Sequence, residues 1–364
     1  MPCLLKIIFA LWMLQVEPVT GPSLETESNP QLSVLAFNIL TSGNPPGPDA
    51  ASPLYRTSRQ ERIVEIILEY SPDVVLLQEG HHAQGIHSLL RKADPDWRMQ
   101  DGGDRGQMIL ARHHLEQIGE NSARVETPSG PVVVHNVHWE PYPYGPYECQ
   151  KRLLEGAPSI DAKEILAASD KGEIYARTYR DIHPALLAGV PVVVGGDFNE
   201  PSHLDWSGDY LRSGPDRWLS NPTEVPLKAL ISWKGSRLLS NPGEFSEELQ
   251  LGAGVALPPL VDSFRAVRPS AVTDPGNTWT PAYSAETVDR RFYRARVGHQ
   301  ASEDQPTAVL DRIDMIYASA ELIPREVLVL GDSGDPSTDR GYTPWPSDHR
   351  AVLARFTLRP SPDE

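Results

Sequence analysis

Cysteine is scarce in this chain: only Cys3 and Cys149 occur among its 364 residues. Cys3 lies in an N-terminal segment that we expect to be removed, which leaves Cys149 without a partner. An internal disulfide and a cysteine-based zinc site are then both excluded. A chain of this length buries enough apolar surface to fold without such crosslinks. We therefore expect Cys149 to be a partly buried, unreactive thiol.

Positive charge is also in short supply. The chain has 33 lysines and arginines against 49 aspartates and glutamates, which gives a formal net charge of −16. An acidic surface repels polyanions, so the composition does not support a broad basic groove for duplex nucleic acid. Because a bound metal ion can reverse the field locally, nucleic acid stays open as a substrate.

Long hydrophobic runs are missing as well. The N-terminal apolar run Ile7–Leu14 follows Lys6 and is too short to cross a bilayer. A short apolar run after a basic residue is typical of a secretory signal. We therefore expect a signal peptide over residues 1–21, a disordered leader over residues 22–30, and a secreted or extracytoplasmic protein with no transmembrane segment. The alternatives are a buried helix and a misassigned start of the chain.

Proline, in contrast, is abundant, with 35 residues that sit mainly in connections between periodic segments. Such connections are typical of long ordered loops on a rigid scaffold. Apolar periodicity predicts strands and helices that alternate along the chain. The expected strands cover residues 32–38, 73–78, 106–112, 132–139, 192–196, 309–318, 327–330 and 351–358, and the expected helices cover residues 59–70, 147–168, 173–188 and 260–267.

These elements are expected to form one domain over residues 31–360. Pro158 is a natural place for the helix at 147–168 to break. Residues 200–305 form a long excursion, rich in Pro, Ser, Gly and Trp in its first part, which we expect to carry short helices. Strands that alternate with helices before a strand-rich end favour two sheets in one layered α/β domain with helices outside. A single doubly wound sheet is the competing fold.

Polar side chains that can bind a metal or move a proton follow or begin several of the predicted strands. They are Asn38, Glu79, Asn136, His138, Asp197, Asn199, Asp311, Arg312, Asp314, Asp348 and His349. One such residue is usually a cap or a turn. Layered α/β proteins, however, build their sites where strands end, so six strand ends of this kind together indicate a site.

This set resembles the endonuclease/exonuclease/phosphatase superfamily of metal-dependent phosphoesterases, which includes deoxyribonuclease I, apurinic endonucleases, neutral sphingomyelinases and inositol polyphosphate phosphatases. The resemblance spans residues 32–358. Its motifs are Phe37-Asn38-Ile39-Leu40, Leu77-Gln78-Glu79, Asn136-Val137-His138, Gly196-Asp197-Phe198-Asn199, Arg312-Ile313-Asp314 and Ser347-Asp348-His349, with weaker matches at Asp262-Ser263-Phe264-Arg265 and Asn277-Thr278-Trp279. The resemblance implies a four-layer α/β/β/α sandwich, in which two packed mixed sheets carry outer helices.

The resemblance also implies a metal site built from hard oxygen donors. Glu79 is then the main ligand, Asn38 is a neighbouring ligand or positions it, and Asp348 is a further ligand. Such donors favour Mg²⁺, or Mn²⁺ in its place. The sequence leaves open whether one or two ions bind.

Five further residues are implied to act on the attacking water and the phosphate. His349 is either the general base or a phosphate-binding group, and Asp314 fixes its tautomer. Asp197 aligns or deprotonates the water, and which of Asp197 and His349 takes the proton stays open. Asn199 and His138 donate hydrogen bonds to phosphate oxygens as charge develops there.

Two features point away from duplex DNA as substrate. Leu40 stands where the apurinic nuclease branch carries an acidic residue. A proline-stiffened loop carries Tyr142, Tyr144 and Tyr147, and with Trp206 it would form an apolar wall beside the phosphate. The alternative is that these aromatic side chains only pack the loop against the rest of the protein.

The function expected from these features is that of a secreted, monomeric, metal-dependent phosphodiesterase with a small or lipid-like substrate. The alternatives are a secreted nuclease acting on DNA or RNA and an inositol-phosphate-type phosphomonoesterase, for which residues 290–296 supply a short basic stretch. A non-catalytic binding module on the same fold is disfavoured, because binding alone does not require a base together with the carboxylate that orients it.

Overall fold

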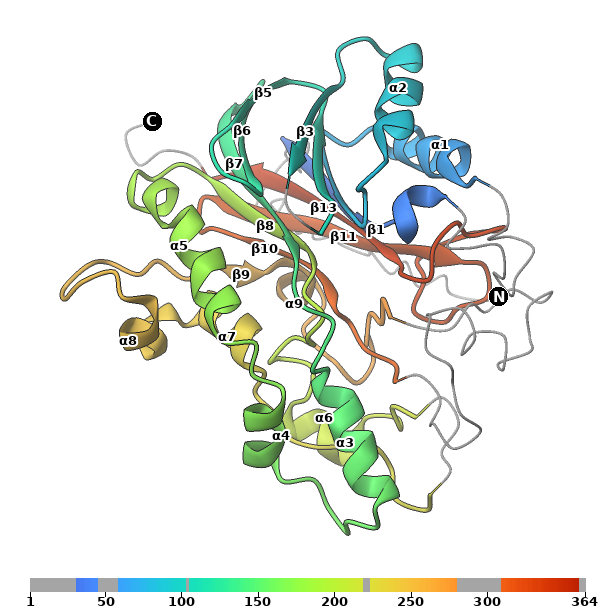
Figure 1. Ribbon diagram of the computed structural model, residues 1–364, viewed down its shortest axis with the longest axis vertical. Helices are drawn as coiled ribbons and strands as arrows, with labels where there is room; N and C mark the ends of the chain where they lie inside the picture. The colour runs from blue at the N-terminus through green and yellow to red at the C-terminus, as the bar shows by residue number, and fades with distance from the viewer. Residues whose placement is uncertain (1–30, 45–57, 103–104, 219–222, 280–308, 360–364) are drawn as a thin grey trace, which may run out of the picture.

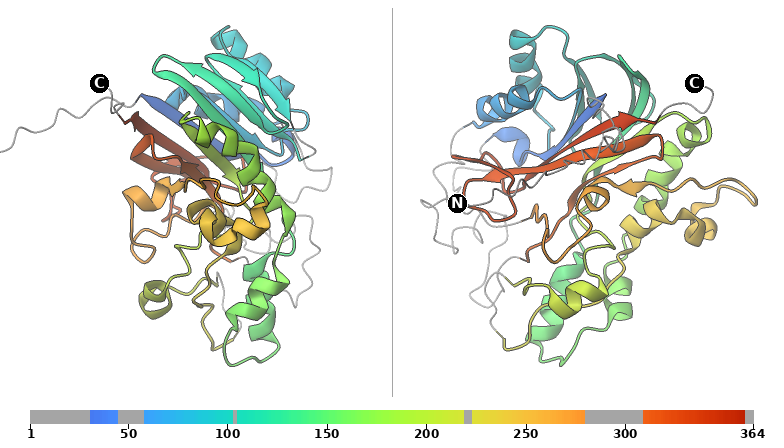
Figure 2. Two further views of the ribbon diagram at one scale, coloured as in Figure 1. Left: turned by 90° about the vertical axis from the view of Figure 1, so that its left-hand side faces the viewer. Right: turned by 180° about the vertical axis from the view of Figure 1, so that it is seen from behind.

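Two β-sheets lie face to face at the centre of the computed structural model, with helices on their outer faces (Figures 1 and 2). The structure describes residues 31–44, 58–102, 105–218, 223–279 and 309–359. The expected signal peptide and leader, and the basic stretch at 290–296, lie outside the described residues.

The first sheet has seven strands in the order β12-β11-β13-β1-β2-β4-β3. Their bounds are β1 Leu32–Asn38, β2 Val74–Gln78, β3 Arg98–Gly102, β4 Gln107–Ala111, β11 Leu322–Asp332, β12 Arg340–Tyr342 and β13 Ala351–Leu358. The sheet is mixed, because β1 runs parallel to β2 and β11 runs parallel to β12, whereas the other pairs are antiparallel.

The second sheet has six strands in the order β5-β6-β7-β8-β10-β9. Their bounds are β5 His114–Gln117, β6 Ser122–Thr127, β7 Gly130–His138, β8 Val192–Asp197, β9 Val261–Asp262 and β10 Asp314–Ala318. Here β7 and β8 form the parallel pair. Both sheets are therefore mixed, as the family resemblance implies.

Alternation along the strands explains how the sheets pack. In β1, Val34 and Ala36 contact the apolar residues of the second sheet, whereas Leu35 and Phe37 point to the outer helices. In β8, Val193 faces the first sheet. Successive side chains of a strand point to opposite faces of the sheet, so one apolar strand packs against the other sheet on one face and against helices on the other.

The helices form the outer layers. Their bounds are α1 Gln60–Tyr70, α2 Gln84–Ala93, α3 Gly145–Leu154, α4 Ala162–Ala168, α5 Glu173–Leu187, α6 Gly208–Ser213, α7 Lys234–Ser240, α8 Ser246–Leu249 and α9 Ser263–Val267, with 3-10 turns η1 Thr41–Gly43 and η3 Pro242–Phe245. Helices α1 and α2 cover the first sheet, and α5, α7 and α8 cover the second (Figure 1). The four-layer sandwich is confirmed, and the doubly wound single sheet is wrong.

Several element predictions need correction. Residues 147–168 form two helices, α3 and α4, with the break around Pro158. The segment 260–267 is a short strand followed by α9, and β10 begins at Asp314 rather than at residue 309. Helix α2 and strands β3, β5 and β6 were not predicted. Each has a short apolar pattern, and β5, an edge strand, is largely exposed.

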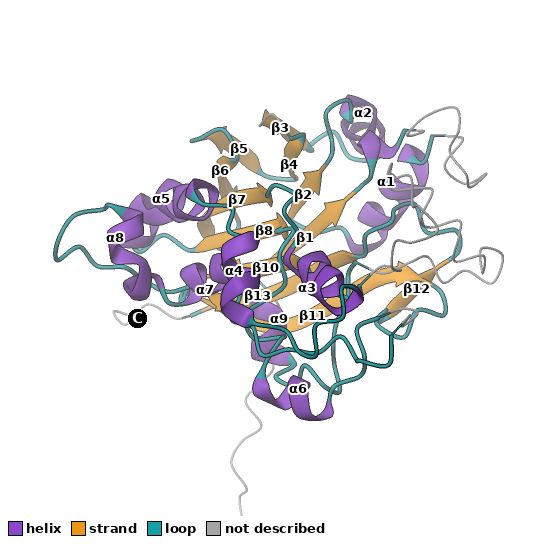
Figure 3. Cartoon of the chain, turned by 60° about the horizontal axis from the view of Figure 1, so that its bottom comes forward, coloured by secondary structure: helices purple, strands orange, loops and turns teal. Residues whose placement is uncertain are grey.

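The excursion after β8 builds an apolar cluster of its own together with α3 and α4. Trp206, Trp218, Ile231 and Trp233 lie at its centre, against Cys149. Helices α3, α4 and α6 thereby project beyond the two sheets (Figures 1 and 3). Within the part of the chain that the structure describes, each helix is too short or too polar to traverse a bilayer.

Candidate active site

The ends of neighbouring strands bring the predicted site residues to one place. In the second sheet, Asp197 at the end of β8 is the register partner of both His138 in β7 and Asp314 in β10. In the first sheet, Asn38 ends β1 beside the end of β2, where Glu79 follows. The Asn38 Nδ2 atom donates to Asp197 Oδ2 at 3.0 Å and so connects the two sheets.

Asp197 is the centre of the arrangement and is almost fully buried. Its Oδ1 accepts from the backbone N–H of Asn199 at 2.8 Å, and its Oδ2 accepts from Asn199 Nδ2 at 3.2 Å. The Nε2 atoms of His138 and His349 lie 3.7 and 3.8 Å from the same Oδ2. Donors and imidazoles therefore converge on one carboxylate oxygen from both sheets.

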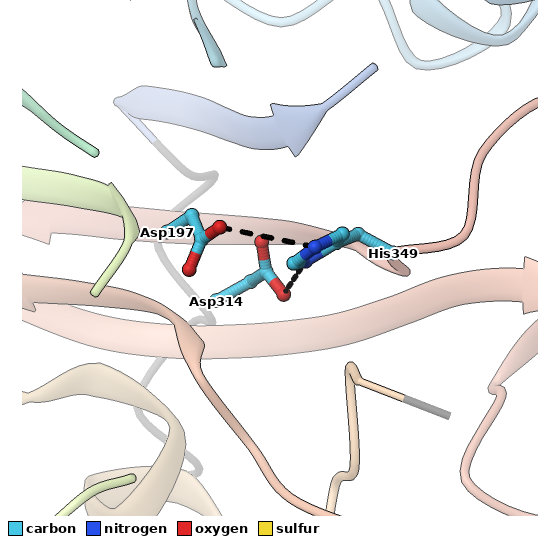
Figure 4. Close-up of side chains that lie close together, drawn as sticks. All are labelled: Asp197, Asp314 and His349. Atoms are coloured by element: carbon cyan, nitrogen blue, oxygen red, sulfur yellow. Dashed lines mark hydrogen bonds and ion pairs between the residues drawn. The ribbon is translucent and has the colours of Figure 1, made fainter. Parts of the chain in front are cut away.

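His349 and Asp314 form a buried pair (Figure 4). The Nδ1 atom of His349 lies 2.9 Å from Asp314 Oδ2, which directs Nε2 toward Asp197. Burial alone would lower the pKa of His349, but the Asp314 and Asp197 carboxylates raise it to about 10. The Thr278 hydroxyl fixes the backbone at Asp314, because its Oγ1 accepts from the N–H groups of both Ile313 and Asp314. The predicted His–Asp pair is thus present in the structure.

Glu79 is half-buried and is oriented by two donors. Its Oε1 accepts from Asn38 Nδ2 at 3.3 Å, and its Oε2 accepts from the backbone N–H of Thr41 at 2.8 Å. Glu79 has a φ of 58°, a left-handed conformation that costs a non-glycine residue about 1–3 kcal/mol. Asn38 thus binds Glu79 through its amide N–H, which favours the alternative in which Asn38 positions Glu79.

Asp348 is buried next to His349, in the segment before β13. The neighbouring Ser347 Oγ donates to the backbone oxygen of Asn38 at 2.6 Å, and the N–H of His349 donates to Ser347 Oγ at 3.2 Å. The Ser-Asp-His segment is therefore attached to the end of β1. It carries Asp348 and His349 to the same edge of the sandwich as Glu79.

The donor chemistry of this edge fits a divalent cation. Glu79, Asp197, Asp314 and Asp348 supply four carboxylates, and among the described residues no lysine or arginine forms an ion pair with any of them. Asp197, Asp314 and His349 each offer a ligand atom within 4.8 Å of the others. Buried carboxylates need a compensating charge, and oxygen donors suit Mg²⁺ or Mn²⁺.

A comparison with protein families identifies the chain. The model of the endonuclease/exonuclease/phosphatase family matches residues 35–349, a range that includes Asn38, Glu79, Asp197, Asp314 and His349. The chain belongs to this family. Its members are hydrolases that act on phosphoester bonds and generally use a divalent metal ion.

Individual relatives are distant. Uncharacterized protein F14F9.5 of Caenorhabditis elegans is 27% identical over 342 residues, which cover 90% of this chain and 91% of that protein. A solved structure of truncated C. elegans TDP2 is 16% identical with a TM-score of 0.43, covering 90% of this chain and 98% of that one. An AP endonuclease structure from Archaeoglobus fulgidus is 14% identical with a TM-score of 0.43, covering 90% and 100%.

The two predicted phosphate donors of this family member already have partners. The Nδ1 of His138 binds the backbone oxygen of Arg105 at 3.0 Å. A carbonyl only accepts, so the proton sits on Nδ1, and His138 donates from Nε2 only when it is doubly protonated. The Nδ2 of Asn199 donates to the Trp139 backbone oxygen at 3.0 Å as well as to Asp197. Both side chains border the centre, and their roles toward phosphate stay predictions.

Lys171 was not predicted from the sequence. It lies just before α5 and donates from Nζ to the backbone oxygen of Asn199, whose φ of 46° is left-handed. Burial lowers the pKa of its ammonium to about 8, and the Glu200 and Asp197 carboxylates oppose that shift. A lysine that binds a backbone carbonyl has no characteristic spacing from other residues in the sequence. Its contact with Asn199 is therefore visible only in the structure.

The aromatic side chains after β7 divide into two groups. Tyr142 is 47% exposed, and Tyr147 is partly buried next to Tyr144. Tyr144 and Trp206 are buried, and they bind the two carboxylate oxygens of Asp311 at 3.0 Å each. Their burial and these internal hydrogen bonds favour the alternative that Tyr144 and Trp206 pack the loop against the rest of the protein, and a contact with substrate stays a prediction.

Trp279 belongs to the site instead. Its ring lies 4.7 Å from the His349 ring, centroid to centroid, and it hydrogen-bonds to the Tyr147 side chain. The sequence offered a weak signal in the Asn277-Thr278-Trp279 match. Trp279 therefore connects Tyr147 to the His349 imidazole.

Proposed function

We propose that this protein is a secreted, Mg²⁺-dependent phosphodiesterase that hydrolyses a small or lipid-like phosphodiester by in-line attack of water. The observation that carries this proposal is the arrangement of His349, Asp314 and Asp197 beside Glu79, which joins a proton-transfer centre to a cluster of oxygen ligands. Secretion is supported by Lys6 and the apolar run Ile7–Leu14 that follows it.

Glu79 and Asp348 would hold the cation, with Asn38 positioning Glu79. When bound, the ion neutralises charge on the phosphate and on the leaving oxygen. The four carboxylates of the site would otherwise repel an anionic substrate, so the affinity of the protein for phosphate depends on this compensation.

In this proposal Asp197, rather than His349, accepts the proton of the attacking water. Its Oδ2 accepts from Asn38 Nδ2, and the Nε2 atoms of His138 and His349 lie 3.7 and 3.8 Å from that oxygen. His349 is flanked by carboxylates on both sides, an environment that favours the imidazolium form. In this form it donates from Nε2 to a phosphate oxygen as negative charge builds there. The water oxygen bonds to phosphorus while the opposite phosphorus–oxygen bond breaks, so no covalent enzyme intermediate is needed.

The substrate class is inferred from charge and from the aromatic wall. The net charge of −16 disfavours a long polyanion. Leu40 is buried and offers no carboxylate at a position that is acidic in apurinic nucleases. Tyr142 is exposed and Tyr147 partly exposed, and Tyr147 contacts Trp279, whose ring packs on His349. These aromatic side chains suit an organic leaving group better than the phosphate backbone of a nucleic acid.

A substrate panel tests the proposal. Bis-p-nitrophenyl phosphate, phosphatidylcholine vesicles, supercoiled plasmid, single-stranded DNA and inositol phosphates are incubated with the protein and Mg²⁺, with Glu79→Gln as control. We expect hydrolysis of the small diester or the phospholipid by wild type alone. Faster cleavage of plasmid or single-stranded DNA would establish the nuclease alternative, and phosphate release only from inositol phosphates would establish the monoesterase. No turnover of any substrate contradicts the proposal.

Replacing Tyr142 with alanine tests the aromatic wall. An aromatic contact contributes about 0.5–1.5 kcal/mol, so we expect KM for bis-p-nitrophenyl phosphate to rise about 2- to 10-fold with kcat nearly unchanged. Steady-state kinetics measure both constants. Ile118→Ala is the matched control, because Ile118 is 48% exposed in the connection between β5 and β6. Equal KM values for Tyr142→Ala and wild type would remove Tyr142 from the substrate site.

A further inference from the structure

Arg59 is a buried arginine whose guanidinium connects two loops at the active edge. Only 3% of the residue is exposed, although it lies immediately before α1 at the surface end of that helix. Its Nη1 donates to the backbone oxygen of Pro346 at 2.6 Å, and its Nη2 donates to those of Leu40 and Asn44 at 2.7 and 2.6 Å. One rigid planar group therefore spans the loop after β1 and the segment before β13.

Both of these segments carry the oxygen donors of the candidate metal site. In the loop after β1, the N–H of Thr41 donates to Glu79 Oε2 at 2.8 Å. In the segment before β13, Pro346 is two residues from Asp348, and Ser347 Oγ binds the Asn38 backbone oxygen at 2.6 Å. A shift of either loop would move Glu79 relative to Asp348.

The loop after β1 needs such support because its backbone is strained. Leu40, Thr41 and Ser42 have φ values of 48°, 49° and 62°, three consecutive non-glycine residues in the left-handed region. Each such residue costs about 1–3 kcal/mol and persists only where its surroundings hold it in place. The backbone N–H of Arg59 adds a further bond, to the Gly43 oxygen at 2.7 Å. Arg59 thus binds this strained loop from its side chain and its main chain.

We propose that Arg59 is a positioning residue for the divalent-metal site. Its guanidinium holds the Thr41 amide against Glu79 and holds the Ser347-Asp348 segment against β1, so that the Glu79 and Asp348 carboxylates keep their positions at the active edge. Groups that orient metal ligands from outside the ligand shell contribute about 10- to 100-fold to metal affinity. The inference rests on the proposed metal-dependent function, and it assigns to Arg59 a role in metal affinity rather than in the chemical step.

The test is isothermal titration calorimetry with Mn²⁺ on the full chain, for wild type, Arg59→Gln and Arg62→Gln. Arg62 is the matched control, because it is on the same helix and binds Glu65 and the Pro344 oxygen at the surface. We expect the Mn²⁺ Kd to rise at least about 10-fold in Arg59→Gln and to stay within about twofold in Arg62→Gln. At saturating metal, kcat of Arg59→Gln should recover to within a few-fold of wild type.

Thermal unfolding in chelator distinguishes a loss of metal affinity from a loss of fold, because it reports the stability of each variant without metal. If Arg59→Gln does not fold, Arg59→Lys replaces it in the titration. Lysine keeps the charge without the planar fork, so an intermediate Kd is expected. A wild-type Kd in a folded Arg59 variant overturns the inference. If wild type binds Mn²⁺ but hydrolyses no phosphoester, the proposed function fails while the Arg59 inference is still decided. If wild type binds no Mn²⁺, both fail.

Discussion

Replacing His349 with glutamine is expected to lower kcat for phosphodiester hydrolysis by about 10²- to 10⁴-fold. Glutamine retains a polar group of similar length but cannot carry the proton that His349 holds between Asp314 and Asp197. Stopped-time assays with bis-p-nitrophenyl phosphate at saturating Mg²⁺ measure the loss. KM should change much less than kcat, because the lost interaction develops with the charge of the transition state.

His113 supplies a matched control for this experiment. It also forms a histidine–aspartate pair, with His113 Nε2 2.9 Å from Asp73 Oδ1, but Asp73 precedes β2 whereas Glu79 follows it. We expect His113→Gln to keep kcat within about twofold, since a pair at the opposite end of the strand takes no part in phosphate chemistry. Similar losses in the two variants would mean that a histidine–aspartate pair supports the fold and not the chemistry.

Replacing Arg312 with methionine is expected to lower the free energy of unfolding by about 3–5 kcal/mol. Arg312 is buried and binds Asp205 and Asp262 with two bonds each, at 2.7–3.0 Å. Methionine has a similar length but no charge, so two buried carboxylates would keep only the nearby Arg265 as cation. Urea unfolding followed by tryptophan fluorescence measures the change.

An exposed arginine pair gives the comparison. Arg212 binds Asp209 three residues earlier, and its side chain is 70% exposed. Exposed pairs contribute about 0–1 kcal/mol, so Arg212→Met should change stability by less than about 1 kcal/mol. If Arg312→Met were as mild as Arg212→Met, the excursion that carries Asp205 would not depend on β10 for its position.

The catalytic centre was predictable because its residues occupy strand ends. Asp197, Asp314 and His349 each adjoin a short apolar strand, and parallel or antiparallel pairing then determines which polar ends meet. The two-sheet sandwich followed from the same alternation, together with the family resemblance. Edge strands such as β5 were missed, since a half-exposed strand has little apolar periodicity to detect.

The supporting residues were not predictable for a physical reason. Arg59 and Lys171 act through backbone carbonyls, and a carbonyl has no side-chain identity that a sequence pattern could match. Tyr144 and Trp206 were assigned to substrate because an aromatic, proline-rich segment does not reveal which rings are buried. Both rings bind Asp311, whose burial requires partners for both carboxylate oxygens.

The most direct test of metal-dependent phosphodiester hydrolysis is the rate at which one preparation hydrolyses bis-p-nitrophenyl phosphate after chelation and again with excess Mg²⁺. Glu79→Gln is treated in parallel, because it keeps the shape of the side chain while removing the charge that would hold the ion. We predict that chelated wild type is inactive, that Mg²⁺ restores its activity, and that Glu79→Gln, with or without Mg²⁺, stays at least about 10³-fold slower than the Mg²⁺-restored wild type. Equal rates of wild type with and without metal, or equal rates for wild type and Glu79→Gln in excess Mg²⁺, would contradict the proposed function.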